Sequence, residues 1–297
     1  MSKTVKGVIF TLIGAICWGF CGSCGDVLFK QKGFSADWVS CVRLLSAGLI
    51  LVILSVLKEK KKAFDIFKKP KSIWMLVAFG IFGLMVSQFT YLTTINYSNS
   101  GTATILQYTG LAMILVVVCV MEKRLPKIFE TLALVFAMGG IFLIATHGDI
   151  KTMVISKECL FWGLFSAVGL VCYSMIPKKL LKEYGAITAS GFGMIIGGVV
   201  LCLIIRPWQY AVSFDFGAVL ALLGVIIIGT VVAYNLYLMG VNLIGPVKAG
   251  MIAAIEPVAA AVFSFLFVGT SFTFWDVIGF AFIISTVFIS NIKKELS

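Results

Sequence analysis

The sequence repeats itself, and both copies are dominated by apolar segments. The stretch YLTTIN at 91–96 is similar to YLMGVN at 237–242. Further upstream, GAICW at 14–18 is similar, more weakly, to GLVCY at 169–173. Transporters built from two repeats have sequences of this kind, and they bind their solute between the repeats near the middle of the bilayer. The duplication therefore predicts a membrane protein whose two halves enclose one central site.

The composition leaves lipid as the main solvent of the chain. Of its 297 residues, 60% are hydrophobic and only 12% are charged, whereas a soluble domain carries roughly 25% charged residues. A transmembrane helix needs about 20 apolar residues, and backbone groups in lipid must find partners within their own segment. We expect an all-α membrane protein with ten transmembrane helices. Their segments are 7–25, 38–57, 73–95, 101–121, 126–146, 159–177, 185–205, 216–240, 246–268 and 272–292.

The basic residues indicate orientation in a membrane and argue against nucleic-acid binding. The net charge is +11, but most of the lysines and arginines lie in short loops between the apolar segments. If the N-terminus is cytoplasmic, 18 of the 24 Lys and Arg residues fall on the cytoplasmic side. Cytoplasmic loops carry such an excess. We therefore expect a multi-pass protein of the cytoplasmic membrane with both termini inside, the lipid bilayer around it and no nucleic-acid partner.

Five helices in each copy are an odd number, so the second copy must enter the membrane from the opposite side. The repeats are then inverted and related by a pseudo-two-fold axis in the membrane plane. About the same offset that relates the aligned stretches also carries Glu130 onto Asp276. We place the first five-helix repeat at 1–150 and the second at 151–297, within one integrated transmembrane domain.

Glu256 stands inside the ninth apolar segment, in the stretch AAIEPV at 253–258. A charge at the centre of a transmembrane helix costs about 2.5–3.5 kcal/mol on insertion scales, so such residues usually face a cavity or a partner. Pro257 has no backbone N–H and leaves an upstream carbonyl without its helical donor. Two roles stay open for Glu256: a proton carrier during transport, or a protonated hydrogen-bond partner between helices.

Polar and aromatic residues recur in the segments expected to face the interior. An aromatic body with a polar tip suits a pocket for an amphipathic ligand, and it equally suits the interfacial belt of a membrane protein. Arg43 is a candidate anchor for an anionic group, a partner for Asp26 or Asp37, or a side chain that reaches the interface. The residues expected to bind the solute are Trp18, Gln88, Tyr91, Gln107, Tyr108, Tyr173, Tyr234, Asn235 and Glu256.

The chain shows no pattern for catalysis or for a cofactor. It has no glycine-rich phosphate loop and no cluster of His, Asp and Glu within the apolar segments. Its eight cysteines lie mostly within or beside these segments, where small residues let helices pack closely. We expect no enzyme activity, no catalytic residue, no metal and no cofactor.

Several motifs resemble those of a known family. GAICWG at 14–19 and RLLSAG at 43–48 resemble the first two helices of the ten-helix EamA-type branch of the drug/metabolite transporter superfamily. TATILQYTGL at 102–111 resembles the fourth helix, and AGMIAAIEPV at 249–258 resembles the ninth. The resemblance covers nearly the whole chain. It implies an inner-membrane carrier, often an exporter of amino acids or other metabolites, whose central cavity is lined by helices 1, 3, 4, 6, 8 and 9.

These features together predict a secondary transporter that moves a small metabolite by alternating access, with amino-acid export as the leading form. An exporter of small drugs or organic cations on the same fold is the alternative. A channel-like facilitator or a membrane enzyme belongs to a different class, because a channel conducts without saturation and an enzyme changes its substrate. Protons are the candidate coupling ion.

Overall fold

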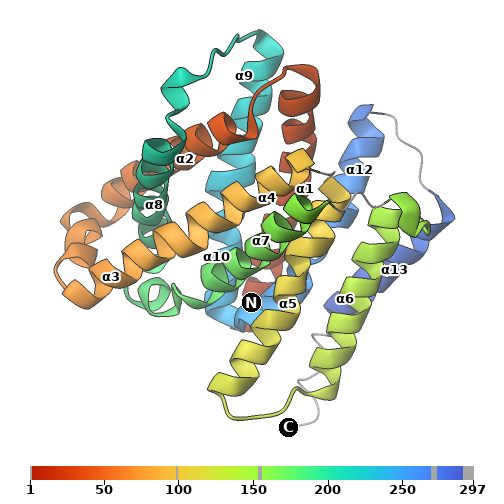
Figure 1. The fold of residues 1–297 in the computed structure, drawn as a ribbon. Helices are drawn as coiled ribbons and strands as arrows, with labels where there is room; N and C mark the ends of the chain where they lie inside the picture. Colours follow the sequence, from red (N-terminus) through yellow and green to blue (C-terminus); the bar gives the residue numbers. More distant parts are fainter. Residues whose placement is uncertain (1, 98–99, 153–155, 269–272, 290–297) are drawn as a thin grey trace.

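The computed structural model describes residues 2–97, 100–152, 156–268 and 273–289, and this part of the chain contains helices and no strand (Figure 1). The first repeat consists of α1 (Lys3–Asp26) with η1 (Val27–Gln31), α2 (Ala36–Glu59), α3 (Pro70–Ala78) with η3 (Phe79–Met85) and α4 (Val86–Tyr97), α5 (Ser100–Met121) and α6 (Ile128–Thr146). The second consists of α7 (Lys157–Met175), α8 (Lys178–Ile205), α9 (Phe216–Leu223) with η6 (Gly224–Val232) and α10 (Ala233–Ile244), α11 (Pro246–Ala253) with α12 (Glu256–Val268), and α13 (Phe274–Ile289). Short 3₁₀ helices lie in the connections: η2 (Lys60–Phe67), η4 (Ile150–Thr152) and η5 (Pro207–Gln209).

The lengths and compositions of these units agree with an all-α membrane protein. Seven of them, within the described residues, are long and apolar enough to cross a bilayer, and α6 and α13 are shorter apolar helices. The remaining unit is α11 with α12, which is interrupted at Ala254 and Ile255. The prediction of ten transmembrane helices in two repeats is confirmed.

The packing of the helices shows how the two repeats are related. The first helix of the first repeat, α1, packs on α10 and α12 of the second, while the first helix of the second repeat, α7, packs on α4 and α5 of the first. Two further pairs join equivalent helices, α2 with α8 and α6 with α13. Exchanging the repeats therefore turns the contacts of α1 into those of α7 and leaves the α2–α8 and α6–α13 pairs as they are, as expected for inverted repeats about an approximate two-fold axis.

Glycines let the equivalent helices approach at equivalent places. A Cβ atom added to Gly14 would lie 2.9 Å from the carbonyl oxygen of Ala233. A Cβ atom added to Gly169 would lie 2.7 Å from the Cα atom of Ser87. Ser87 and Ala233 are separated by the same offset as the similar stretches 91–96 and 237–242. The weak similarity around Gly14 and Gly169 thus has a structural cause, since both must pass a neighbouring backbone without a side chain.

Of the three π-helical segments in the described residues, η1, η3 and η6, the last two occupy equivalent positions, which the apolar pattern did not predict. η3 interrupts the third unit just before α4, and η6 interrupts the eighth just before α10. Thr230 in η6 donates its hydroxyl hydrogen to the carbonyl of Val225, five residues earlier, at 2.8 Å. Short π-helical segments within longer helices are frequent at functional sites. Both segments lead directly into helices that line the central cavity.

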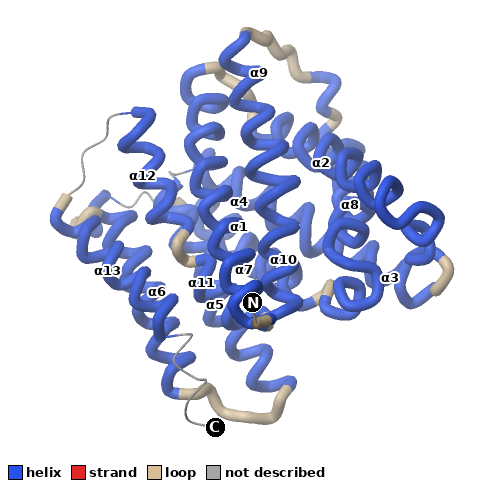
Figure 2. Tube along the Cα trace, turned by 180° about the vertical axis from the view of Figure 1, so that it is seen from behind, coloured by secondary structure: helices blue, strands red, loops and turns tan. Residues whose placement is uncertain are grey.

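The outer helices form two flanks around the central helices. α2, α3 and α8 lie on one flank, and α6 with α13 lies on the other, in both views (Figures 1 and 2). The first turns of α6 and α13 are capped alike: Glu130 accepts from the backbone N–H of Lys127 at 2.9 Å, and Asp276 accepts from that of Thr273 at 2.7 Å. The predicted equivalence of Glu130 and Asp276 thus corresponds to a shared helix cap.

One face of the molecule gathers lysines. A depression of about 460 Å³ there is lined by the end of α5, the starts of α6, α8 and α11 and the last described residue, Ile289. The start of α1 belongs to the same face, because Gly7 lies against Ile244, which also lines the depression. We call this the lysine-rich face; the basic residues in the depression are Arg124, Lys127, Lys178, Lys182 and Lys248.

Candidate solute-binding cavity

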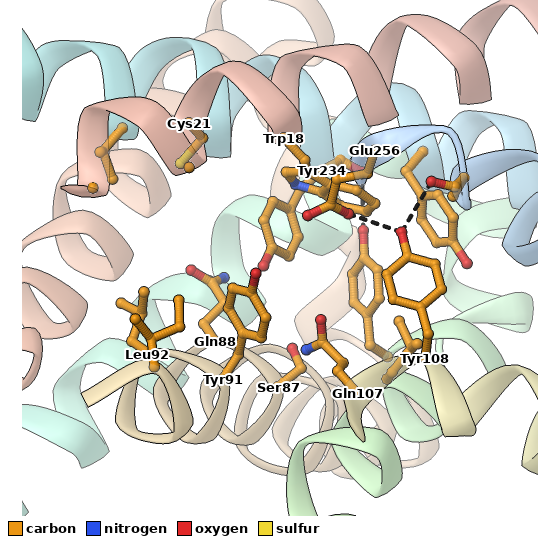
Figure 3. A pocket seen from close by; sticks show the side chains of 18 of the residues that line it. Trp18, Cys21, Ser87, Gln88, Tyr91, Leu92, Gln107, Tyr108, Tyr234 and Glu256 are labelled. Carbon is orange, nitrogen blue, oxygen red and sulfur yellow. Dashed lines mark hydrogen bonds between the residues drawn. The ribbon is translucent and has the colours of Figure 1, made fainter. Parts of the chain in front are cut away.

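A cavity of about 110 Å³, room for several water molecules, lies between the two repeats (Figure 3). Helices of both repeats line it: α1, α2, α4 and α5 from the first, and α7, α10, α11 and α12 from the second. It reaches Phe29, Val39 and Ile95, which lie near the ends of their helices away from the lysine-rich face. The cavity therefore extends from the centre toward the face opposite the lysines.

Most of the residues predicted to bind the solute line this one cavity. They come from all six helices that the resemblance assigns to the cavity, the ninth being the broken unit of α11 and α12. The lining includes Trp18, Gln88, Tyr91, Gln107, Tyr108, Tyr173, Tyr234 and Glu256. The structure thus brings eight predicted side chains together from positions spread over most of the sequence.

Asn235 is the predicted residue that the structure does not bring to the cavity. Asn235 follows Tyr234 in α10, and its side chain is turned about 100° away from that of Tyr234. Tyr234 takes the cavity side. The amide nitrogen of Asn235 donates to the Val231 carbonyl of its own helix at 2.7 Å. Its role as a solute ligand is not supported by this position.

Two stacked tyrosines, Tyr173 and Tyr237, close the cavity toward the lysine-rich face, and Trp18 on the cavity wall packs against the aromatic group around them. The ring of Trp18 lies 5.1 Å from that of Tyr234 and 5.0 Å from that of Tyr237, measured between centroids. Tyr173 and Tyr237 are stacked at 5.5 Å with an interplanar angle of 19°. The Tyr237 hydroxyl also shares a hydrogen bond of 3.1 Å with Ser174. Tyr237 was not among the predicted site residues, although its equivalence to Tyr91 was a signal that could have found it.

Glu256 lies at the break between α11 and α12, and Tyr108 spans that break. The Tyr108 hydroxyl is 2.9 Å from the Ala253 carbonyl and 2.9 Å from the Glu256 carboxyl group (Figure 3). Ala253 is the residue whose carbonyl would accept from residue 257 in a continuous helix, and Pro257 has no N–H to give. The sequence indicated that this carbonyl lacks its helical donor, and a protonated Glu256 was one group able to replace it. The structure shows that Tyr108, from the other repeat, reaches it.

Several polar groups on the cavity wall have no hydrogen-bond partner among the described residues. Both amide atoms of Gln88 are buried in this way, as are Nε1 of Trp18 and Nε of Arg43. A buried polar group without a partner costs about 1–3 kcal/mol, so such groups mark places where water or a ligand is expected. The cavity wall therefore offers both donors and an acceptor to a bound molecule.

Two structurally related halves around one central cavity define the chain as a membrane transporter of the two-repeat class. A model of the EamA-like transporter family matches residues 5–146 and 157–292, one match in each half, and the chain belongs to this family. The resemblance noted in the sequence is thereby confirmed. The chain is accordingly a multi-pass membrane protein of a transporter family.

Similar proteins cover nearly the same length. The uncharacterized inner membrane transporter YicL of Salmonella typhimurium is 34% identical over 295 residues, which span 99% of this chain and 98% of YicL. The uncharacterized transporter YrdR of Bacillus subtilis is 21% identical over 312 residues, spanning 97% of this chain and 92% of YrdR. A solved crystal structure, at 14% identity, covers 97% of this chain with a TM-score of 0.76 and shows the same fold.

Proposed function

We propose that the protein is a secondary transporter that moves a small metabolite, an amino acid or a related compound, across the cytoplasmic membrane by alternating access, in the direction of export. The observation that carries this proposal is the cavity between the repeats, with partnerless polar groups on its wall. A site enclosed by two inverted repeats can be exposed to either side when one repeat rocks against the other. The solute passes through unchanged.

The test is uptake into liposomes that contain the purified protein. We expect saturable uptake of at least one amino acid, and faster uptake when the liposomes are preloaded with the same unlabelled compound. Such counterflow is a property of carriers. Uptake that rises linearly with concentration would instead favour the channel-like facilitator, and a chemically altered solute would favour an enzyme.

An exporter of small drugs or organic cations is the second candidate, and one observation favours it. Glu256 lines the cavity together with Trp18, Tyr108 and Tyr234, and an acidic group among aromatic rings suits a cation. A screen that includes quaternary ammonium compounds distinguishes the two candidates. Uptake of those compounds in preference to amino acids would establish the second.

The orientation of the proposed carrier follows from its charges. With the lysine-rich face in the cytoplasm, both ends of the described chain lie inside, and the cavity opens to the outside in this conformation. Reporter fusions measure this directly: a fluorescent protein fused after residue 297 is expected to mature in the cytoplasm, whereas a periplasmic phosphatase at that position is expected to stay inactive.

Protons are proposed as the coupling ion, acting at Glu256. Tyr108 has one hydroxyl hydrogen and two oxygen neighbours at 2.9 Å. If Glu256 is protonated, its carboxyl group donates to the Tyr108 hydroxyl, and that hydroxyl donates to the Ala253 carbonyl. Both contacts of Tyr108 are then hydrogen bonds. If Glu256 is ionised, it attracts the Tyr108 hydrogen and the Ala253 carbonyl loses its donor. Loss of the proton would therefore shift the Tyr108 hydrogen bond from the Ala253 carbonyl of α11 to the Glu256 carboxylate of α12.

The variant Glu256→Gln tests this role, because an amide can still donate to Tyr108 but cannot release a proton. We expect it to retain counterflow of unlabelled against labelled solute and to lose uptake driven by a pH gradient. Unchanged pH-driven uptake would show that Glu256 acts only as a hydrogen-bond partner between helices.

A further inference from the structure

Arg43 is a buried cation on the cavity wall with no carboxylate partner among the described residues. Its side chain is 5% exposed and lines the cavity from α2. Of the two acidic partners considered from the sequence, Asp37 accepts a hydrogen bond from Tyr210 at 3.0 Å instead. The side chain of the other, Asp26, lies outside the described residues. No acidic side chain among the described residues lies within ion-pair distance of Arg43, and Glu256, elsewhere on the same cavity wall, acts on its charge only at longer range.

The hydrogen bonds of Arg43 leave it ready to bind an acceptor. Its Nη2 donates to the Tyr234 hydroxyl at 3.3 Å, and the guanidinium carbon lies 5.8 Å from the centre of the Tyr234 ring. Its Nε is buried and has no acceptor. Burying a charge without a partner is costly, so a guanidinium in such a position is normally paired. The planar fork of guanidinium donors matches the two oxygens of a carboxylate.

The remaining wall limits what else a bound molecule can contain. Among the described lining residues, Glu256 is the other charged one, and Tyr108 already occupies one of its oxygens. The rest of the lining is mostly aromatic, aliphatic or glycine; the exceptions are Cys21, Ser87, Gln88 and Gln107. Such a wall accommodates an apolar body beside one anionic and one cationic position.

We propose that Arg43 anchors the carboxylate of the transported solute, and that this solute is a carboxylate-bearing metabolite with an apolar body. This inference rests on the proposed transport function and narrows it. It also separates the two candidate functions, because an organic cation without a carboxylate would bring a second positive charge into the cavity and leave the guanidinium of Arg43 without a hydrogen-bonded anion.

The experiment compares molecules that differ only at the carboxylate. The probes are L-phenylalanine, L-leucine and L-methionine, each with its own carboxamide. Two readouts are used: the rise in Tm of the full-length protein in detergent, and competition for saturable uptake into liposomes. In the natural protein, we expect at least one acid to bind about 10- to 100-fold more tightly than its amide, the range typical of hydrogen bonds to charged groups. In Arg43→Gln, the acid and amide should bind within about threefold of each other.

A scaffold role for Arg43, acting through its hydrogen bond to Tyr234, is the competing explanation. Tyr234→Phe removes that hydrogen bond and leaves the guanidinium, so the acid-to-amide ratio should persist in this variant if Arg43 is the anchor. Arg43→Lys keeps the charge, and its acid-to-amide affinity ratio should lie between those of the natural protein and Arg43→Gln. Arg206→Gln, on an exposed arginine outside the cavity, is the matched control.

Four outcomes would overturn the inference. One is equal binding of acids and amides by the natural protein, another is an unchanged acid-to-amide ratio in Arg43→Gln, and the third is that none of the six probes shifts Tm. Preference for phosphate monoesters over carboxylates would also overturn it. Because the Tm shift needs no transport, failure of the proposed function is recognised separately, as binding without saturable uptake.

Discussion

The two sides of the cavity have different conformations, although the repeats make them equivalent. Tyr173 of α7 and Tyr237 of α10 are stacked and close the cavity toward the lysine-rich face. Their counterparts in the aligned stretches are Trp18 of α1 and Tyr91 of α4. Trp18 and Tyr91 lie on opposite sides of the cavity (Figure 3). We call Tyr173 and Tyr237 the closed pair, and Trp18 and Tyr91 the open pair.

This difference indicates the other state of the proposed cycle. In transporters with inverted repeats, each half can adopt the conformation that its partner has in the opposite state. Exchanging the conformations here would stack Trp18 on Tyr91 and separate Tyr173 from Tyr237. The cavity would then be closed on its present open side and would face the lysines.

The largest expected effect tests the equivalence of the two halves. Gly14→Leu and Gly169→Leu should each place a side chain against a neighbouring backbone less than 3 Å from the new Cβ atom. Overpacking of this kind costs about 3 kcal/mol at its upper end, and both variants should lose most of their folded protein. Gly22→Leu is the control, since nothing lies within 4 Å of its added Cβ. Size-exclusion profiles and Tm in detergent measure the loss of folded protein. If Gly169→Leu were stable while Gly14→Leu was not, the two glycines would not be equivalent.

A smaller effect is expected at the contact between α5 and the broken ninth unit. Tyr108→Phe removes the hydroxyl that serves the Ala253 carbonyl and the Glu256 carboxyl group. Leaving such buried groups without a donor costs about 1–3 kcal/mol, which should lower Tm clearly. Tyr97→Phe, at an exposed tyrosine near the end of α4, should leave Tm unchanged. Equal Tm values for Tyr108→Phe and Tyr97→Phe would show that the Tyr108 hydroxyl does not stabilise the break between α11 and α12.

Removing one ring of the closed pair should moderately raise the population of molecules in which the cavity is accessible from the lysine-rich face. Tyr237→Ala removes one stacked ring, an interaction worth about 0.5–1.5 kcal/mol beyond its buried area. In a protein whose native cysteines are replaced, Ser174→Cys should then react several-fold faster with a membrane-impermeant thiol reagent. The matched variant Tyr91→Ala, on the open side, should not accelerate this reaction. Equal labelling in both variants would contradict the assignment of the closed side.

The smallest effect is expected for an exposed ion pair on the open side. Lys32, just after η1, pairs with Asp215 at the start of α9. The hydrogen bond from Lys32, followed by that from the backbone of Ala218, lowers the pKa of Asp215. The stabilisation of the folded protein by the Lys32–Asp215 ion pair is therefore present at neutral pH. It is lost as the pH falls below the ordinary Asp range.

Exposed ion pairs contribute little, so the Tm of Asp215→Asn should lie close to that of the natural protein at neutral pH, and any gap should vanish in acid. The amide still caps α9, which separates the charge from the cap. A large Tm loss at neutral pH would show that this pair holds the open side in its present conformation.

The sequence predicted the fold well because the membrane constrains it strongly. Length and hydropathy alone separated the apolar segments, and the odd number per repeat required the inversion. The site was predicted less completely. Asn235 was expected beside Tyr234, but the structure does not place it on the cavity wall, because a uniformly apolar helix gives no phase that tells which side faces inward. The partner of Arg43 stayed open because it depends on where α10 brings Tyr234. Tyr108 as the donor to Ala253 depends on the docking of α5, which no local pattern encodes.

The π-helical segments have a further consequence for the cavity. η3 precedes Gln88 and Tyr91, and η6 precedes Tyr234 and Tyr237, so each half carries one surplus residue just ahead of its cavity-lining turn. Converting a π segment into an α-helix shifts the hydrogen-bond register by one residue, which rotates the following turns by about 100° and moves them by about 1.5 Å. Such a step changes which side chains face the cavity while the downstream helix stays intact. Changing the side chains that face the cavity would then require only a local exchange of backbone hydrogen bonds in η3 or η6, and the flanking helices could remain in place.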